Sequence, residues 1–369
     1  MANTFLEVKE IARQTLPRLI ENLVFPNLIH KDFSDDFEVG KGATIQVRKP
    51  VVLTASEFNA NSGTSAQDVT ETSVDVTLDK LATVDVEFGA VARATSVDSL
   101  NRLFLEPAAV ALAEKINSDG LDLYKDIPYY TGTVGTTPSG LAAFADAANI
   151  LDKNKVPEAG RRGVWNPDSM ASFRKSGDLV NVEKSGTTEA LRRGSIGVVF
   201  GIENYMAQGV RTHTSGDLSA GSGMLKVKTA VTNSGTVVIN GTQTATGGVV
   251  KGDILKIGNK THIVTADATA DAGVITISVV PNVTAPQNEG VTLVGNHVAN
   301  MVFHENAFAF VTRPLSQPAG VESYVTSYNG VSLRVTRGYD MKYKKEMLSM
   351  DVLYGYKTMY PELACLVIA

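Results

Sequence analysis

DSLNRLFLEPAAVALAEKINSDGLDLYK, residues 98–125, is the longest helical pattern in the chain, and the rest of the sequence is organised around it. Apolar residues recur here at every third or fourth position, which would place them on one stripe of a helix. They are Leu100, Phe104, Ala108, Ala111, Leu112, Ile116, Leu123 and Ile127. The sequence on either side favours β-strands, so a single long helix is expected to stand among strands.

Two prolines bear on the limits of this helix. Pro128 is placed to stop it, while Asp98 is suited to cap its start. Pro107 is unfavourable inside a helix, because it has no N–H and clashes with the preceding turn. The sequence therefore predicts a short turn over residues 98–105 and a main helix that opens at Pro107. At about 1.5 Å per residue, that helix would be about 28 Å long.

Size and composition describe an ordinary globular protein. With 369 residues the chain is expected to form about two or three compact units. Its net charge of −5 gives no support for a surface devoted to coating nucleic acid. No secretion signal and no stretch of about 20 apolar residues is visible, so we expect synthesis in the cytosol and no membrane association. The single cysteine, Cys365, is expected to be a small buried apolar residue.

The N-terminal segment predicts an amphipathic helix over residues 4–25, bent at Pro17 and ended by Pro26. One face carries only apolar residues: Val8, Ala12, Leu16, Leu19 and Leu23. Such a face needs a covering surface, which its own chain, a neighbouring subunit or a separate partner would supply. The acidic cluster Asp35, Asp36 and Glu38 that follows is interpreted as a solvated loop.

Alternating apolar residues then predict three strands between residues 44 and 88. Their apolar positions are Ile45, Val47 and Val51, then Val74, Val76 and Leu78, and last Val84, Val86 and Phe88. The polar segment 53–68 between the first two strands is too long for a tight turn, so a two-stranded arm with a polar tip is expected. Because an isolated hairpin is only marginally stable, the arm should pack on another surface, either of a neighbouring subunit or of its own domain.

After the long helix the pattern becomes a mixture of helices and strands. Helices are predicted over residues 141–153 and from Asn166 to Phe173, with a short strand at residues 163–165 between them. Further strands are predicted near residues 191–206, 303–315, 331–338 and 346–360. In the last of these, Leu348, Met350, Val352, Tyr354 and Tyr356 share one face. The apolar C-terminus, LACLVIA, is expected to be a buried strand.

The clearest boundary signal is a change of composition. No Phe, Trp or Tyr occurs between Tyr205 and Phe303, although aromatic residues make up 7% of the chain. In their place stand short alternating runs of Val, Ile, Leu and Thr, and Gly258-Asn259 suits a two-residue hairpin turn. About five or six such strands predict a small barrel or sandwich over residues 215–299, inserted into the mixed domain and packed by aliphatic side chains.

The sequence offers little sign of catalysis. The five histidines, His30, His213, His262, His297 and His304, show no metal-binding spacing. His304 and Glu305 are expected to be neighbours in a strand and so to face opposite sides. The glycine-rich segment 131–140 lacks the Gly-Lys-Ser/Thr ending of a phosphate-binding loop, and the NSDG run at residues 117–120 lacks most ligands of a calcium loop. We therefore expect no enzyme, no cofactor and no metal site.

Six stretches carry a resemblance to a known family. They are LPRLIENLVFPNLIHKDFSDDFEVGKGATIQVRKP (16–50), LFLEPAAVALAEKI (103–116), NPDSMASF (166–173), LRRGSIGVVFGIENYMAQGVRTHTSG (191–216), FHENAFAFVTRPL (303–315) and MDVLYGYKTMYPE (350–362). In order and spacing the chain resembles the major capsid proteins of tailed phages, which have the HK97-type fold. It is most similar to the branch of short-tailed enterobacterial phage coat proteins that carry an inserted small β domain.

The resemblance implies an α+β fold with a defined order of parts. These are an N-terminal arm (1–38), an extended β loop (39–92), the spine helix of a peripheral domain (93–130), an axial domain (131–213 and 300–330), the inserted β domain (214–299) and the C-terminal strands of the peripheral domain (331–369). It also implies candidates for contacts between subunits on the arm helix and at the loop tip. These are Leu16, Leu19 and Leu23, and Glu57, Phe58, Asn59, Asn61, Ser65 and Gln67.

The function implied by the resemblance is structural. Copies would form hexamers and pentamers that close into an icosahedral shell around double-stranded DNA, without reading its sequence. The expected partners are a scaffolding protein, a portal and possible decoration proteins, and the expected location is the virion, assembled in the bacterial cytoplasm. No long charged helical segment precedes the arm, so the scaffolding protein is expected to be separate. The alternatives are an encapsulin-like compartment shell, a phage tail or adhesin-like β protein, and, more distantly, an enzyme.

Overall fold

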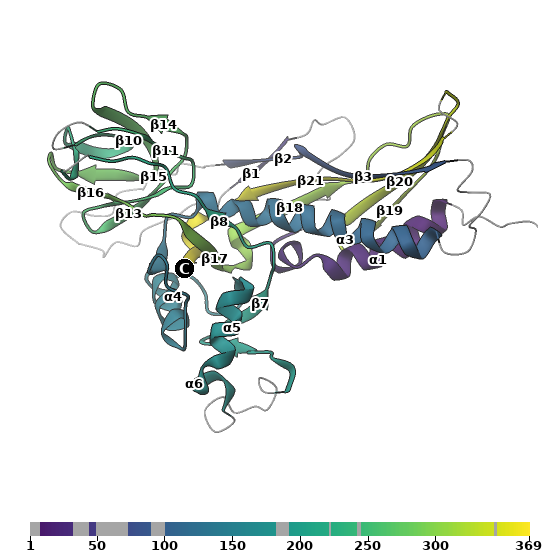
Figure 1. The fold of residues 1–369 in the computed structure, drawn as a ribbon, viewed down its shortest axis with the longest axis horizontal. Helices are drawn as coiled ribbons and strands as arrows, with labels where there is room; N and C mark the ends of the chain where they lie inside the picture. The colour runs from purple at the N-terminus through teal and green to yellow at the C-terminus, as the bar shows by residue number, and fades with distance from the viewer. Residues whose placement is uncertain are drawn as a thin grey trace, which may run out of the picture. The chain divides into compact units, whose positions relative to one another are not determined.

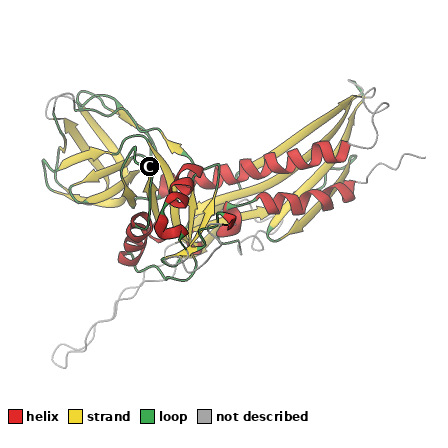
Figure 2. Cartoon of the chain, turned by 60° about the horizontal axis from the view of Figure 1, so that its bottom comes forward, coloured by secondary structure: helices red, strands yellow, loops and turns green. Residues whose placement is uncertain are grey.

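The computed structural model describes residues 8–31, 44–48, 73–89, 100–181, 192–220, 223–241, 245–342 and 345–369. The chain forms two compact units, each assembled from separate stretches of sequence. Unit 1 contains Met1–Leu16, Lys31–Leu105 and Ala309–Met359, and unit 2 contains Pro17–His30, Glu106–Phe308 and Tyr360–Ala369. Helices and strands occur together in both, which confirms the mixed α and β class (Figure 1 and Figure 2).

Unit 1 is built on a five-stranded sheet around the longest strand of the chain. The strands run in the order β18 (Phe308–Arg313), β21 (Lys345–Thr358), β20 (Val331–Asp340) and β19 (Glu322–Tyr328), and β3 (Lys80–Gly89) also pairs with β21. The predicted apolar face of β21 is confirmed: Leu348, Met350, Val352 and Tyr354 are buried, and Tyr356 is half-buried. A strand with one buried face has a fixed register, because a slip of one residue would turn that face to solvent.

The first two predicted strands form a separate two-stranded sheet. β1 (Thr44–Arg48) pairs antiparallel with β2 (Ser73–Thr77), with Val47 opposite Val74. The predicted arm is therefore confirmed at its base. Its tip and the acidic cluster Asp35, Asp36 and Glu38 lie outside the described residues.

Unit 2 contains a seven-stranded sheet that incorporates the C-terminus. The strands run in the order β4 (Tyr130–Gly132), β22 (Ala364–Ile368), β17 (His297–His304), β5 (Arg161–Trp165), β7 (Ile202–Met206) and β6 (Val198–Val199), with β8 (Thr212–His213) also paired to β17. All five residues of β22 are buried, including Cys365, as the sequence predicts. Burial raises the pKa of the Cys365 thiol well above its ordinary value, which makes the thiol unreactive.

Three helices and an aromatic cluster accompany this sheet. They are α4 (Ala142–Lys153), α5 (Pro167–Lys175) and α6 (Gly177–Val180), and the first two confirm predicted helices. Asn166 caps α5, because its side-chain oxygen accepts a hydrogen bond from the Ser169 N–H at 2.9 Å. Phe144, Trp165 and Phe173 pack ring to ring, with centroids 4.5–5.1 Å apart. These three rings lie in a core that is otherwise filled by aliphatic side chains, Met170 and Cys365.

The long helix departs from the prediction at its start. α3 runs without interruption over Leu100–Leu121, so the predicted opening at Pro107 is wrong. Pro107 lies on the exposed side of the helix, where its ring displaces no packed neighbour. Packing of the following turns, with Ala108, Leu112 and Ile116 buried, offsets the lost backbone hydrogen bond. The predicted stripe is also narrower than expected, since Ala111 is exposed.

The N-terminal helix is confirmed as α1 (Val8–Asn22), and all five predicted apolar positions are buried. A 3-10 helix, η1 (Phe25–Leu28), follows, so Pro26 lies inside this short helix after α1 has ended at Asn22. Asn117 of α3 fixes the connection: its side-chain oxygen accepts from the N–H groups of Val24 and Phe25 at 3.1 and 3.2 Å. Its amide donates to the Asn22 carbonyl at 2.9 Å. The polar residue in the NSDG run therefore serves to anchor another segment.

Residues 225–293 supply the strands of a closed six-stranded barrel, as the composition predicts. Around the barrel the order is β10 (Val231–Gly241), β15 (Val274–Ala285), β13 (Lys260–Val264), β12 (Ile254–Ile257), β16 (Gly290–Leu293) and β9 (Leu225–Val227). Gly258-Asn259 forms the turn between β12 and β13, with Gly258 in the left-handed region. The core consists of Val, Ile, Leu and Ala side chains, which confirms the predicted aliphatic packing.

Gly355 of β21 is where this fold tolerates no side chain. A Cβ at this position would overlap the Thr77 carbonyl of β2, and backbone cannot move aside cheaply. We expect Gly355→Ala to lower the free energy of unfolding by about 2 kcal/mol, measured by urea denaturation. Gly338→Ala in β20 is the matched control, because a Cβ there meets no atom within 4 Å. Equal effects of the two substitutions would contradict this account of the contact between β2 and β21.

Candidate functional site

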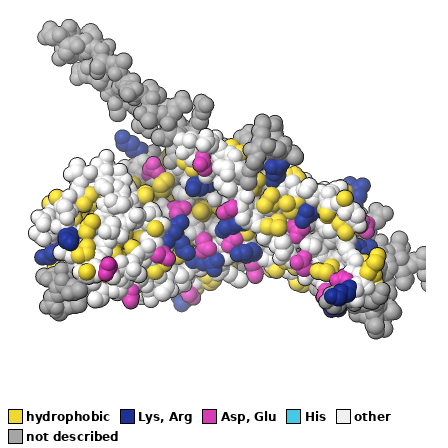
Figure 3. Space-filling view, turned by 90° about the horizontal axis from the view of Figure 1, so that it is seen from above, with side chains coloured by type: hydrophobic (Ala, Val, Ile, Leu, Met, Phe, Trp, Pro, Cys, Tyr) yellow, Lys and Arg dark blue, Asp and Glu magenta, His cyan; other side chains and the backbone are white. Residues whose placement is uncertain are grey.

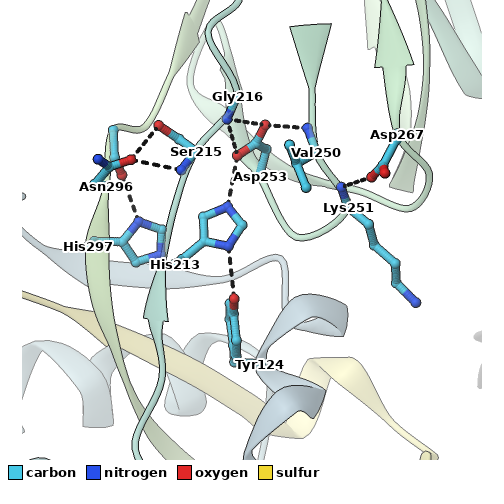
Figure 4. Close-up of polar contacts among 11 residues, drawn as sticks. Tyr124, His213, Ser215, Gly216, Val250, Lys251, Asp253, Asp267, Asn296 and His297 are labelled. Atoms are coloured by element: carbon cyan, nitrogen blue, oxygen red, sulfur yellow. Dashed lines mark hydrogen bonds and ion pairs between the residues drawn. The ribbon is translucent and has the colours of Figure 1, made fainter.

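The described part of the chain holds no grouping of side chains that could bind a metal ion. Within it, no three His, Cys, Asp or Glu side chains come together in a way that could hold a metal ion. Nor does any described helix combine the length and the apolar character needed to cross a membrane. The most concentrated buried polar grouping with a defined geometry lies instead where the barrel joins the seven-stranded sheet, and we call it the polar junction (Figure 4).

The polar junction is built on two strands that connect the barrel to the rest of unit 2. β8 leads into the barrel and β17 leads out of it, and the two pair antiparallel with His213 opposite His297 and Thr212 opposite Val298. The chain therefore leaves the sheet and returns to it at the same place. This paired stem is the arrangement that an inserted segment requires.

A chain of three buried side chains crosses the polar junction. The hydroxyl of Tyr124, in the 3-10 helix η3 (Asp122–Asp126) after α3, lies 2.9 Å from Nδ1 of His213. Nε2 of the same imidazole lies 2.8 Å from Oδ1 of Asp253. Their exposed fractions are 3%, 2% and 0%, so solvent does not compete for these hydrogen bonds. The three residues come from the end of the long helix, the stem and the barrel. Their hydrogen bonds therefore hold these three segments together.

Asp253 is the acceptor at the centre of the polar junction. The Gly216 N–H donates to both carboxylate oxygens at 3.2 and 3.1 Å, and the Val250 N–H donates to Oδ2 at 2.7 Å. With His213 Nε2, three donor groups surround one fully buried carboxylate. A buried charge is tolerable only with such compensation, because transfer out of water costs several kcal/mol.

The partners of His213 fix the place of one proton. A carboxylate oxygen accepts, so Nε2 of His213 carries the hydrogen of its bond to Asp253, while the Tyr124 hydroxyl pairs with Nδ1. Burial, with Asp122 as the next contributor, raises the pKa of Tyr124 to about 12, which keeps this hydroxyl protonated. The order of Tyr, His and Asp resembles a proton relay, yet each member is buried and the chain ends on backbone N–H groups. The hydrogen bonds hold three segments of the chain together.

His297 lies beside these three residues, and only one of its two ring nitrogens has a hydrogen-bond partner in the described part of the chain. Its Nδ1 donates to the Gly295 carbonyl at 2.8 Å, and its ring centre lies 5.2 Å from that of His213. Nε2 is buried and has no hydrogen-bond partner. Burial lowers the pKa of His297, so a proton is disfavoured there.

Further contacts brace the polar junction from outside. Asn296 accepts from both the N–H and the hydroxyl of Ser215, at 2.8 and 3.0 Å. Arg211, just before β8, forms an ion pair with Asp122 of η3, with Nε 2.9 Å from Oδ1. The Lys251 N–H donates to Asp267 at 2.7 Å. The strands entering and leaving the barrel are thus held on several sides.

Sequence reasoning missed the polar junction. Its members are far apart in the chain, and nothing local marks His213 and Asp253 as partners. The available signal was indirect: each is a polar residue in a stretch that folds as buried strand or turn, and buried polar groups need partners. The prediction for His304 and Glu305 is wrong in detail, because β17 ends at His304 and Glu305 begins a 3-10 helix, η4 (Glu305–Ala307). His304 Nδ1 accepts from the Asn306 N–H at 3.2 Å and so caps this turn.

The predicted subunit contacts fall into two groups. Leu16, Leu19 and Leu23 are buried within the chain itself, which gives them a packing role without a neighbour. The loop-tip candidates, Glu57, Phe58, Asn59, Asn61, Ser65 and Gln67, lie outside the described residues. Contacts of either group with another subunit stay predictions.

Exposed apolar side chains mark surfaces that the sequence analysis did not single out. In unit 1, Tyr339 and Met341 at the turn between β20 and β21 are 55% and 78% exposed, and Tyr328 at the end of β19 is 68% exposed. In unit 2, Val198 and Phe200 are exposed beside β6. On the face that Figure 3 presents, Lys and Arg side chains lie among Asp and Glu side chains. The apolar residues are therefore the more distinctive sites for contact with another protein.

Comparison with known proteins supports the fold. No family model matches the sequence, and a search of curated proteins finds no significant match. Among solved structures, the chain is similar to one from Mycobacterium phage Che8, with a TM-score of 0.56 and 19% identity, covering 94% of this chain and 90% of that one. It is also similar to a chain in the capsid structure of cyanophage P-SCSP1u, with a TM-score of 0.54 and 13% identity, covering 94% and 87%. The chain therefore shares the fold of these phage proteins over nearly its whole length.

Removing the charge at the centre of the polar junction is the direct test of its role. Asp253→Asn replaces one acceptor oxygen by an N–H₂ group, which would face a backbone or imidazole N–H. We expect a loss of about 3 kcal/mol in the free energy of unfolding, measured by urea denaturation. Asp271→Asn, on the exposed surface of the barrel, should change it by less than about 0.5 kcal/mol. If both variants keep the stability of the parent, the carboxylate does not hold the junction.

The buried histidines predict that stability falls in mild acid. Burial lowers the pKa of both His297 and His262 from the ordinary value of 6.5. Below that pH the unfolded chain takes up protons that the folded chain excludes, so the free energy of unfolding should decrease as pH falls from 6.5 towards the lower folded values. Urea denaturation at pH 7.5, 6.5 and 5.5 measures the trend.

The matched variant is the double substitution His262→Gln and His297→Gln. It removes both titrating groups, so the decrease of stability between pH 6.5 and 5.5 should be smaller than in the parent. An identical slope in parent and variant would show that other groups set the pH dependence.

Proposed function

We propose that this chain is the major capsid protein of a tailed phage. The observation that carries the proposal is the shared fold with a chain of the cyanophage P-SCSP1u capsid over 94% of the present chain. Copies would assemble as hexamers and pentamers into an icosahedral shell around double-stranded DNA, with the virion as the final location. A separate scaffolding protein, a portal and possible decoration proteins are the proposed partners.

Physical features of the chain support self-assembly. Large apolar side chains at the β20–β21 turn and at the end of β19 remain exposed in the single chain. β19 pairs only with β20 within the described sheet, which leaves one strand edge available. Surfaces of this kind gain stability when another copy covers them, and heterologous contacts that close into rings produce hexamers and pentamers from one chain.

The proposed parts of the chain follow the expected boundaries. The paired stem of β8 and β17 and the closed barrel support a small β domain inserted at residues 214–299, between axial segments 131–213 and 300–330. The β1–β2 sheet supports an extended loop within residues 39–92. The arm at residues 1–38, the spine segment at 93–130 and the C-terminal strands at 331–369 complete the proposal.

Expression of the chain alone and with its scaffolding partner tests the function. Size-exclusion chromatography and negative-stain microscopy should show closed shells, rings of subunits or shell fragments. A monomer or dimer that persists at high concentration in both cases would overturn the proposal. Closed shells that enclose an enzyme in the native host, without DNA, would favour the compartment alternative.

A deletion separates assembly from folding. Removal of residues 56–67 at the proposed loop tip should leave the far-ultraviolet circular dichroism of the subunit unchanged and reduce shell yield at least about tenfold, because a neighbour contact is lost. A Gly/Ser replacement of equal length serves as the control that keeps the span and removes the side chains. Normal shell yield from both variants would rule out the loop tip as a contact between subunits.

A further inference from the structure

A cavity of about 480 Å³ lies between the barrel and the β4–α4 part of unit 2. Its volume falls within the range of about 300–1,000 Å³ that is typical of small-molecule sites. One wall comes from residues next to β4 and at the end of α4, and the other from the β12–β13 hairpin and β15. The side chains that matter are Tyr129, Tyr130 and Lys153 on the first wall, and Lys260, His262 and Pro281 on the second.

His262 is the most informative of these residues. It is only 1% exposed, and its Nδ1 donates to the Pro281 carbonyl at 2.8 Å. That bond fixes the tautomer, so Nε2 carries a lone pair and can accept a hydrogen bond. No described residue donates to Nε2. Nε2 is not one of the fully buried atoms that lack a partner, so it stays accessible from the cavity, where a ligand can donate a hydrogen bond to it.

Four further polar side chains of the lining lack a partner within the described ranges, whereas Asn154 and Asn282 are hydrogen-bonded to Glu362 and Asn233. Neither the hydroxyls of Tyr129 and Tyr130 nor the ammonium groups of Lys153 and Lys260 have a hydrogen-bond or ion-pair partner among the described residues. Partial burial raises the pKa of both tyrosines, so their hydroxyls stay protonated and can donate. The two tyrosines are half-buried and the two lysines are exposed, so all four can reach a ligand held in the cavity that they line.

The charge and shape of the lining restrict what that ligand can be. The lining includes two lysines and no aspartate or glutamate, so it favours an anion. Lysine ammonium groups are common partners of phosphate. The aromatic rings of Tyr129 and Tyr130, with Ile150 and Pro281, add apolar surface suited to a flat ring.

We propose that this cavity binds a small phosphate-bearing ligand with a planar ring, of the chemical class of a nucleoside monophosphate. Lys153 and Lys260 contact the phosphate, the tyrosine rings contact the planar group, and Nε2 of His262 accepts a hydrogen bond from an N–H or O–H of the ligand. The lining of this site shares no residue with the polar junction.

Isothermal titration calorimetry on the full chain tests the site with three probes: AMP, adenosine and inorganic phosphate. We expect saturable binding of AMP that is at least about tenfold tighter than the binding of adenosine or of inorganic phosphate. The reason is that AMP makes both the phosphate contacts and the ring contacts. No saturable binding of AMP would overturn the proposal. Equal affinity for AMP and phosphate would overturn the assignment of the ring contacts.

Charge variants locate the binding. The double substitution Lys153→Gln and Lys260→Gln should weaken AMP binding by about tenfold or more, since charged hydrogen bonds are lost. Lys228→Gln is the control, because Lys228 is an exposed lysine of the same barrel that does not line the cavity. Circular dichroism confirms that each variant is folded before titration. Equal weakening by the control and the double variant would show that binding is a non-specific effect of charge.

Discussion

The fully buried carboxylate of Asp253 is the interaction on which the join between barrel and sheet depends. Leaving water costs such a group several kcal/mol, and the cost is offset only while its donors stay in place. Those donors are Gly216 in the connection between β8 and β9, Val250 in the turn before β12, and His213 of the stem, which in turn holds Tyr124. A displacement of any one segment would leave a charge without compensation. The carboxylate thus makes the correct arrangement of three segments far more favourable than a loosened one.

The two cores of unit 2 differ in the means by which they are filled. The sheet core includes the packed rings of Phe144, Trp165 and Phe173, whereas the barrel core consists of Val, Ile, Leu and Ala side chains. A closed barrel of six strands has a narrow interior, which small aliphatic side chains can fill. Because each core is complete in its own chemistry, the connection between them can be left to polar contacts. The barrel and the seven-stranded sheet thus have separate hydrophobic cores.

Much of this architecture follows from local patterns, and the exceptions have physical reasons. Alternation predicts the buried face of β21, Gly258-Asn259 predicts its hairpin, and Asn166 predicts the start of α5, because each depends on neighbours in sequence. Pro107 leads to a wrong prediction of where α3 begins, because packing further along the helix outweighs the local cost of a proline in its interior. The pairing of His213 with Asp253 cannot be inferred locally, because it exists only once the barrel closes and its stem returns to the sheet. The cavity at His262 is hidden for the same reason.

The absence of aromatic residues between Tyr205 and Phe303 has a spectroscopic consequence. The barrel contributes almost nothing to tyrosine and tryptophan fluorescence or to near-ultraviolet circular dichroism. Its strands still contribute to the far-ultraviolet circular dichroism. Trp165, the only tryptophan, lies against Phe144 and Phe173, so its emission reports on the sheet core. Trp165 emission therefore follows the unfolding of the sheet core alone, without any label, whereas the far-ultraviolet signal sums over all helices and strands of the chain.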